Sequence, residues 1–141
     1  MIYAEFDDNL ITGNEMIDSQ HQELFGKING LLEVCENHDG KLAAIRTLNY
    51  LEEYTDFHFA AEEKLQEEVG YPGLEQHKVK HEELRQVVKE LFEMLEEEEG
   101  PTDGFVEQVN RNVTQWLYEH IKGFDRSVAE FINMRKNPEM L

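Results

Sequence analysis

Residues 74–95 read LEQHKVKHEELRQVVKELFEML, and the spacing of one set of side chains in this stretch decides the fold class. The set advances by alternating steps of three and four residues: Leu74, His77, His81, Leu84, Val88, Leu91 and Leu95. Residues three and four apart share one face of an α-helix. We therefore predict a helix from Leu74 to about Glu99 that buries this stripe.

Three more stretches carry the same alternation of steps. The first predicted helix runs from Asp18, its N-cap, to about Glu36, and the second from about Lys41 to Val69. The last runs from about Phe105 to Lys122, and residues 124–135 are compatible with its continuation. Turn residues separate them, including Gly70, which stands where a C-terminal glycine belongs. Four such helices joined by short turns predict an all-α fold, an antiparallel up-down-up-down four-helix bundle.

We expect three parts in the chain. Residues 1–17 form an N-terminal arm, residues 18–135 form the bundle, and residues 136–141 form a C-terminal tail.

Composition narrows the class of partner. The 31 acidic and 13 basic residues give a formal charge of −18, which argues against nucleic acid and anionic membranes as partners. We find no export signal and no apolar run of the roughly 20 residues that a membrane span needs. The single cysteine, Cys35, fits a reducing compartment and the role of a small core residue. We therefore expect a cytoplasmic protein.

Polar residues on the buried stripes point to function. Five of the six histidines and one glutamate fall at positions where a bundle core needs leucine or isoleucine. An unpaired buried polar group costs several kcal/mol, and a buried carboxylate costs more unless it is neutralised. An up-down bundle brings all six to one end, which predicts a shared metal site. These residues are His21, His58, Glu62, His77, His81 and His120.

Asp125 can join this set only if the last helix loosens. It follows His120 by five residues, which places the two side chains about 140° apart on a regular α-helix. Gly123 lies between them and would permit the loosening. His38 is expected to be an exposed turn residue, and Glu63 to lie beside the site or on the surface.

The motifs around these residues resemble the hemerythrin family in its bacterial single-domain form. They are IDSQH (17–21), HFAAEE (58–63), GYP (70–72), HKVKH (77–81) and WLYEHI (116–121) before Asp125. The resemblance covers roughly residues 5–126. Phe6 stands where many relatives carry tryptophan, a difference that bears on the packing of the arm.

The resemblance implies two non-haem iron ions with an oxo or hydroxo bridge. His77, His81 and His120 would bind one iron and His21 and His58 the other, while Glu62 and Asp125 would bridge both. One coordination position then stays open for dioxygen, on the iron with two histidines. Candidates for an apolar pocket over it, for which core packing is an equally good explanation, are Leu24, Phe59, Trp116 and Leu117.

The function implied is reversible binding of dioxygen, for transport or storage, by a protein that is not an enzyme. A reductase for the ferric form is an expected partner, and no oligomeric state is predicted. Alternatives stay open: sensing of oxygen, nitric oxide or redox state; removal of peroxide or nitric oxide by catalysis; storage of metal; and a structural zinc site. Sensing ranks lower because family sensors usually carry a signalling module, and the bundle takes up nearly all of these residues.

Overall fold

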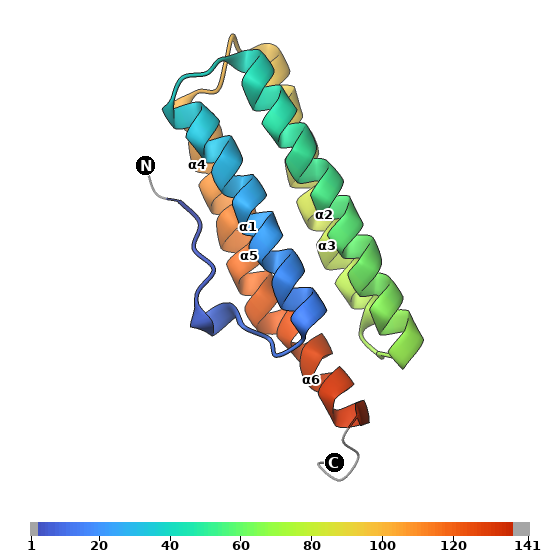
Figure 1. Cartoon of the computed structure of the whole chain (residues 1–141). Helices are drawn as coiled ribbons and strands as arrows, with labels where there is room; N and C mark the ends of the chain where they lie inside the picture. Colours follow the sequence, from blue (N-terminus) through green and yellow to red (C-terminus); the bar gives the residue numbers. More distant parts are fainter. Residues whose placement is uncertain (1–2, 137–141) are drawn as a thin grey trace.

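The computed structural model describes residues 3–136, which contain helices and no strand. Three uninterrupted helices are α1 (Glu15–Glu36), α2 (Lys41–Val69) and α3 (Leu74–Glu97). A fourth helical segment consists of α4 (Asp103–Gln108), η2 (Val109–Thr114), α5 (Gln115–His120), η3 (Ile121–Asp125) and α6 (Arg126–Lys136). These four segments lie antiparallel to their neighbours in the chain (Figure 1), which confirms the predicted four-helix bundle.

Helix α1 begins before the predicted cap. Asn14 is the N-cap, and its side chain accepts a hydrogen bond from the backbone N–H of Ile17 at 3.0 Å. Asp18 lies in the first turn, where its carboxylate accepts hydrogen bonds from Thr12 and Gly13 at 2.7 to 3.1 Å. The Asp18 prediction was therefore wrong: this carboxylate holds the preceding loop, and the asparagine caps the helix.

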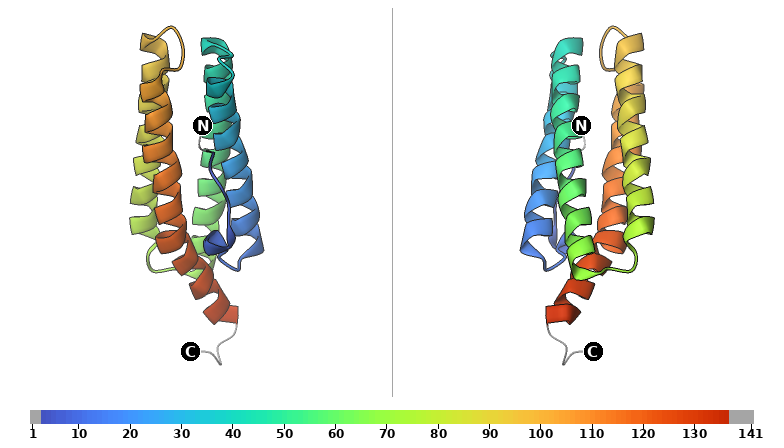
Figure 2. Two further views of the ribbon diagram at one scale, coloured as in Figure 1. Left: turned by 90° about the vertical axis from the view of Figure 1, so that its left-hand side faces the viewer. Right: turned by 90° about the vertical axis from the view of Figure 1, so that its right-hand side faces the viewer.

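The segment before α1 follows the outside of the bundle (Figure 2). Ala4 and Asn29 exchange two hydrogen bonds of 2.7 and 2.8 Å, and the Glu5 N–H donates to the Tyr118 hydroxyl at 2.8 Å. A short 3₁₀ turn, η1 (Asp8–Leu10), buries Leu10. These contacts attach the arm to both α1 and α5.

Helix ends follow from local chemistry. Gly70 ends α2 in the left-handed conformation, with φ of 70°, as predicted. Helix α3 ends at Glu97, two residues before the predicted Glu99. The acidic run 96–99 explains the earlier end, because negative charge near a helix C-terminus opposes the helix dipole.

The fourth segment runs from Asp103 to Lys136 without a break but contains two π-helical stretches. One of them, η3, contains Gly123, so the loosening predicted between His120 and Asp125 is confirmed. Helix α6 extends past the end of the bundle (Figure 2). Residues 137–141 of the predicted tail lie outside the described residues.

The core changes in character along the bundle. The half of the core that lies away from the histidines is apolar, and its buried residues include Leu31, Leu48, Leu91 and Val109. Cys35 is buried there too, as expected, and His38 is exposed in the adjoining turn with φ of 55°. Among residues 3–136, no helix combines the length and apolar character needed to span a membrane.

Candidate metal centre

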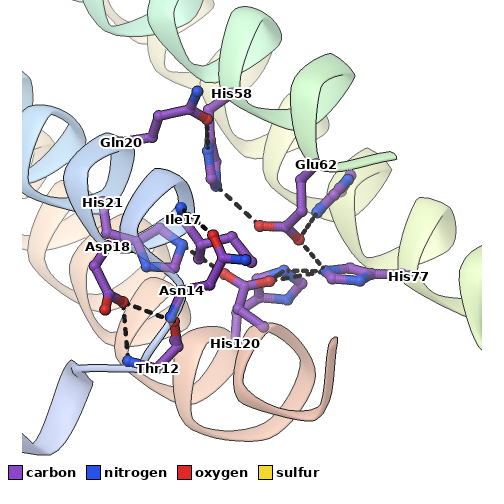
Figure 3. Close-up of polar contacts among 12 residues, drawn as sticks. Thr12, Asn14, Ile17, Asp18, Gln20, His21, His58, Glu62, His77 and His120 are labelled. Carbon is purple, nitrogen blue, oxygen red and sulfur yellow. Dashed lines mark hydrogen bonds and ion pairs between the residues drawn. The ribbon is translucent and has the colours of Figure 1, made fainter. Parts of the chain in front are cut away.

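Seven polar side chains from all four helical segments meet at one end of the bundle. Each has an exposed fraction of 3 % or less. Figure 3 shows the labelled members turned toward a common interior. They are His21 of α1, His58 and Glu62 of α2, His77 and His81 of α3, His120 of α5 and Asp125 of η3.

Local helix geometry explains each pairing along the chain. His77 and His81 are four residues apart on α3, as are His58 and Glu62 on α2, so each pair shares a helix face. His120 and Asp125 are five apart, and the π-helical bonding of η3 joins residues with that separation. The π-helix therefore brings the Asp125 carboxylate to within 3.1 Å of Nε2 of His120.

One group of donor atoms centres on His77. Its Nε2 lies 2.9 Å from Oε1 of Glu62, from Oδ1 of Asp125 and from Nε2 of His120. Nε2 of His81 lies 3.6 Å from the same Glu62 oxygen. Three imidazoles and one oxygen from each carboxylate therefore face one space.

A second group uses the other oxygen of each carboxylate. Oδ2 of Asp125 lies 2.8 Å from Nε2 of His21, and Oε2 of Glu62 lies 3.3 Å from Nε2 of His58. His21, His58, Glu62 and Asp125 thus form a second set of donors that shares both carboxylates with the first. This is the arrangement needed to bridge two adjacent cations.

The hydrogen bonding of the cluster tests whether cations fit it. Both oxygens of Glu62 and of Asp125 are buried without a hydrogen-bond partner, as are Nε2 of His21 and Nε2 of His81. These atoms therefore lie close together without forming hydrogen bonds. Donors about 2.1 Å from one octahedral cation lie about 3 Å apart, as these atoms do. The nitrogen and oxygen donors present fit two cations.

The charges of Glu62 and Asp125 also suit a site for cations. Burial and the neighbouring Asp125 raise the pKa of Glu62, but the close imidazoles of His58, His77 and His81 outweigh them and lower it to about 2. Burial likewise favours a raised pKa for Asp125, yet its close polar contacts with His120, His21 and His77 hold it well below its usual range. Both carboxyl groups are therefore anionic at neutral pH.

The pKa values of His77 and His120 are shifted in opposite directions. Burial lowers the pKa of His77, but the carboxylates of Asp125 and Glu62, each 2.9 Å away, more than compensate and raise it to about 9. For His120 burial prevails and the pKa is lowered. Without a cation, a proton on His77 is thus what partly neutralises the two carboxylates.

Outer partners orient three of the imidazoles. Nδ1 of His58 donates to Oε1 of Gln20 at 2.7 Å, and Nδ1 of His81 donates to Oε2 of Glu63 at 2.7 Å. Of the two places expected for Glu63, beside the site or on the surface, the structure shows the first. Gln20 lies inside the IDSQH motif but was not predicted to have a role at the site.

Gln66 was also missed. It is buried one helical turn after Glu62, and its Nε2 lies 2.8 Å from Nδ1 of His77. Its Oε1 has no hydrogen-bond partner, so a half-turn of the amide would offer an acceptor once Nε2 of His77 binds a cation. Its position four residues after Glu62, on the same face of α2, is the signal in the sequence that could have identified it.

Aromatic rings line the same region. Phe59 stacks on His81 with ring centroids 3.7 Å apart and an interplanar angle of 4°. Trp116, which is half-buried, stacks on His120 at 4.4 Å. Leu24 and Leu117 are buried in the same core as Phe59. The four residues suggested for an apolar pocket are thus in or beside the core, and their role as a pocket stays a prediction.

Comparison with known proteins identifies the family. The family model described as the hemerythrin HHE cation binding domain matches residues 12–132. The chain belongs to the hemerythrin family. The resemblance read from its motifs is therefore confirmed.

Named relatives are similar over most of their length. A bacteriohemerythrin of Stenotrophomonas maltophilia is 30 % identical over 137 residues, which cover 97 % of this chain and 86 % of that protein. One of Clostridium acetobutylicum is 29 % identical over 126 residues, covering 87 % and 96 %. A crystal structure of a hemerythrin mutant superposes with a TM-score of 0.80 at 22 % identity, over 94 % of this chain and 98 % of that one. This similarity supports the fold.

Proposed function

We propose that this hemerythrin-family chain holds two non-haem iron ions and binds dioxygen reversibly, as a carrier or a store. The observation that carries the proposal is the division of each carboxylate, with one oxygen of Glu62 and of Asp125 facing each group of histidines. When bound, two ferrous ions supply the electrons that dioxygen binding requires. The names of the bacteriohemerythrin relatives are consistent with this function.

The donor set favours a carrier over an oxidising enzyme. Di-iron enzymes of the ferritin-like type use four carboxylates and two histidines. Here five buried imidazoles accompany two carboxylates, so neutral nitrogen donors predominate. Such a site stabilises high oxidation states less, which favours reversible binding.

The residues around the cluster would keep water away from it. Phe59 and Leu117 are buried, and Phe59 covers one face of the His81 ring. We propose that these two residues, with Leu24 and Trp116, form the apolar cover that slows loss of the ferrous state. We also propose a cytoplasmic location, where a reductase returns ferric iron to the ferrous form.

The proposal is tested by oxygen cycling. Ferrous protein prepared without oxygen is mixed with oxygen, returned to an oxygen-free atmosphere, and followed by its absorption spectrum and oxygen uptake. We expect uptake of one dioxygen for each pair of irons and recovery of the starting spectrum. Irreversible oxidation, or continuing consumption of oxygen or added peroxide, would instead indicate an enzyme.

A further inference from the structure

The imidazoles of the two donor groups have chemically different outer partners. Glu63 of α2 accepts from His81, which belongs to the group with three histidines. Gln20 of α1 accepts from His58, which belongs to the group with two; Figure 3 shows it on the side of His58 that faces away from Glu62. Both hydrogen bonds are 2.7 Å long, so the partners differ in charge and not in distance.

Each partner fixes the state of its imidazole. A neutral imidazole carries one N–H, so donation from Nδ1 leaves the lone pair on Nε2. In both His58 and His81, Nε2 is the nitrogen on the side of Glu62. Glu63 and Gln20 are therefore positioning residues that keep a lone pair available to a cation.

The charge of Glu63 adds a second effect. Its side chain is only 20 % exposed, so water screens the carboxylate incompletely. A carboxylate that accepts from a ligand histidine makes that imidazole a stronger donor, and stronger donation stabilises the higher charge of a bound metal. The partner of His77 on the same side, Gln66, is an uncharged amide, as is Gln20 on the other.

We propose that Glu63, acting through His81, makes the three-histidine position hold ferric iron more strongly than the two-histidine position. The inference rests on the proposed iron pair. In the step concerned, one ferrous ion becomes ferric and one electron passes to a one-electron acceptor. The Nδ1 proton stays in the hydrogen bond between His81 and Glu63.

The test is an anaerobic redox titration of iron-loaded protein with one-electron mediators. Glu63→Gln removes the charge and keeps an acceptor, and it should lower the ferric-to-ferrous ratio at a fixed potential about tenfold, a rise of about 59 mV in the midpoint potential. The reciprocal variant, Gln20→Glu, should shift the midpoint of the other iron in the opposite direction. Glu67→Gln, which removes one exposed charge from the same helix, is the matched control and should leave both midpoints unchanged.

Iron content separates the ways in which the test can fail. If the wild-type protein holds no iron pair, the proposed function fails. If Glu63→Gln keeps two irons per chain and its potential matches that of the wild type, the role of Glu63 is refuted. If Glu63→Gln loses iron, Gln20→Glu decides: a lowered potential supports the inference, and an unchanged one overturns it.

Discussion

Because the oxygens of Glu62 and Asp125 are buried without hydrogen-bond partners, the stability of this protein should depend on bound cations. A ligand that binds only the folded state at a thousand times its Kd adds about 4 kcal/mol to the free energy of unfolding. An unfolding entropy of about 2.1 cal/mol/K per residue amounts to about 0.3 kcal/mol/K for this chain. Ferrous iron at that concentration should therefore raise the Tm by about 14 °C.

The assay compares thermal unfolding of chelated and ferrous-loaded protein without oxygen, monitored by circular dichroism. Asp125→Asn keeps the volume of the side chain but removes the anionic oxygens that face both groups of histidines, so most of the shift should disappear. Asp56→Asn removes only an exposed ion pair with Arg85 and should keep the full shift. A wild-type Tm that ferrous iron leaves unchanged, or a full shift in Asp125→Asn, would show that the cluster does not bind the cation.

Three further predictions concern protons, the start of α1 and the aromatic cover. Because two carboxylates raise the pKa of His77 to about 9, cation binding at pH 7 should release its proton, and this release should vanish as the pH rises through 9. Calorimetry in buffers of different ionisation enthalpy measures the release, and its absence at pH 7 would contradict the assignment. Asp18→Ala removes three hydrogen bonds from the loop before α1 and should lower the free energy of unfolding by about 1–3 kcal/mol, against roughly 1 kcal/mol for Asn14→Ala. Urea unfolding compares the two variants, and the reverse order would indicate that Asp18 is the cap. Phe59→Ala should lower the free energy of unfolding by about 3–5 kcal/mol in the same urea assay, whereas Leu42→Ala, at an exposed position, should change it little. Equal losses would show that Phe59 is not a core residue.

The sequence was sufficient for much of the fold and for the polar cluster. The stripes identify buried faces because hydrocarbon must leave water in any bundle, and histidines on those faces stand out for the same reason. The end of α2 at Val69 was predicted because Gly70 can end a helix in the left-handed conformation. Gly123 and the five-residue spacing after His120 predicted the loosened turn that became η3.

Features that depend on tertiary contacts were not accessible in this way. Asn14 and Asp18 are both good helix caps, and only the contacts of Asp18 with the preceding loop decide between them. The other π-helix, η2, contains no glycine or proline from which it could have been predicted. Gln20 and Gln66 were missed because glutamine is usually a surface residue of a helix, and their hydrogen bonds to histidines come from neighbouring helices.

The most direct test of the central claim is the metal content of the purified protein, measured by mass spectrometry together with its absorption spectrum. We predict two iron ions per chain, bound by the cluster around Glu62 and Asp125, and a spectrum that changes when the reduced protein meets oxygen. A colourless protein that contains no transition metal and stays equally stable after exhaustive chelation would contradict it.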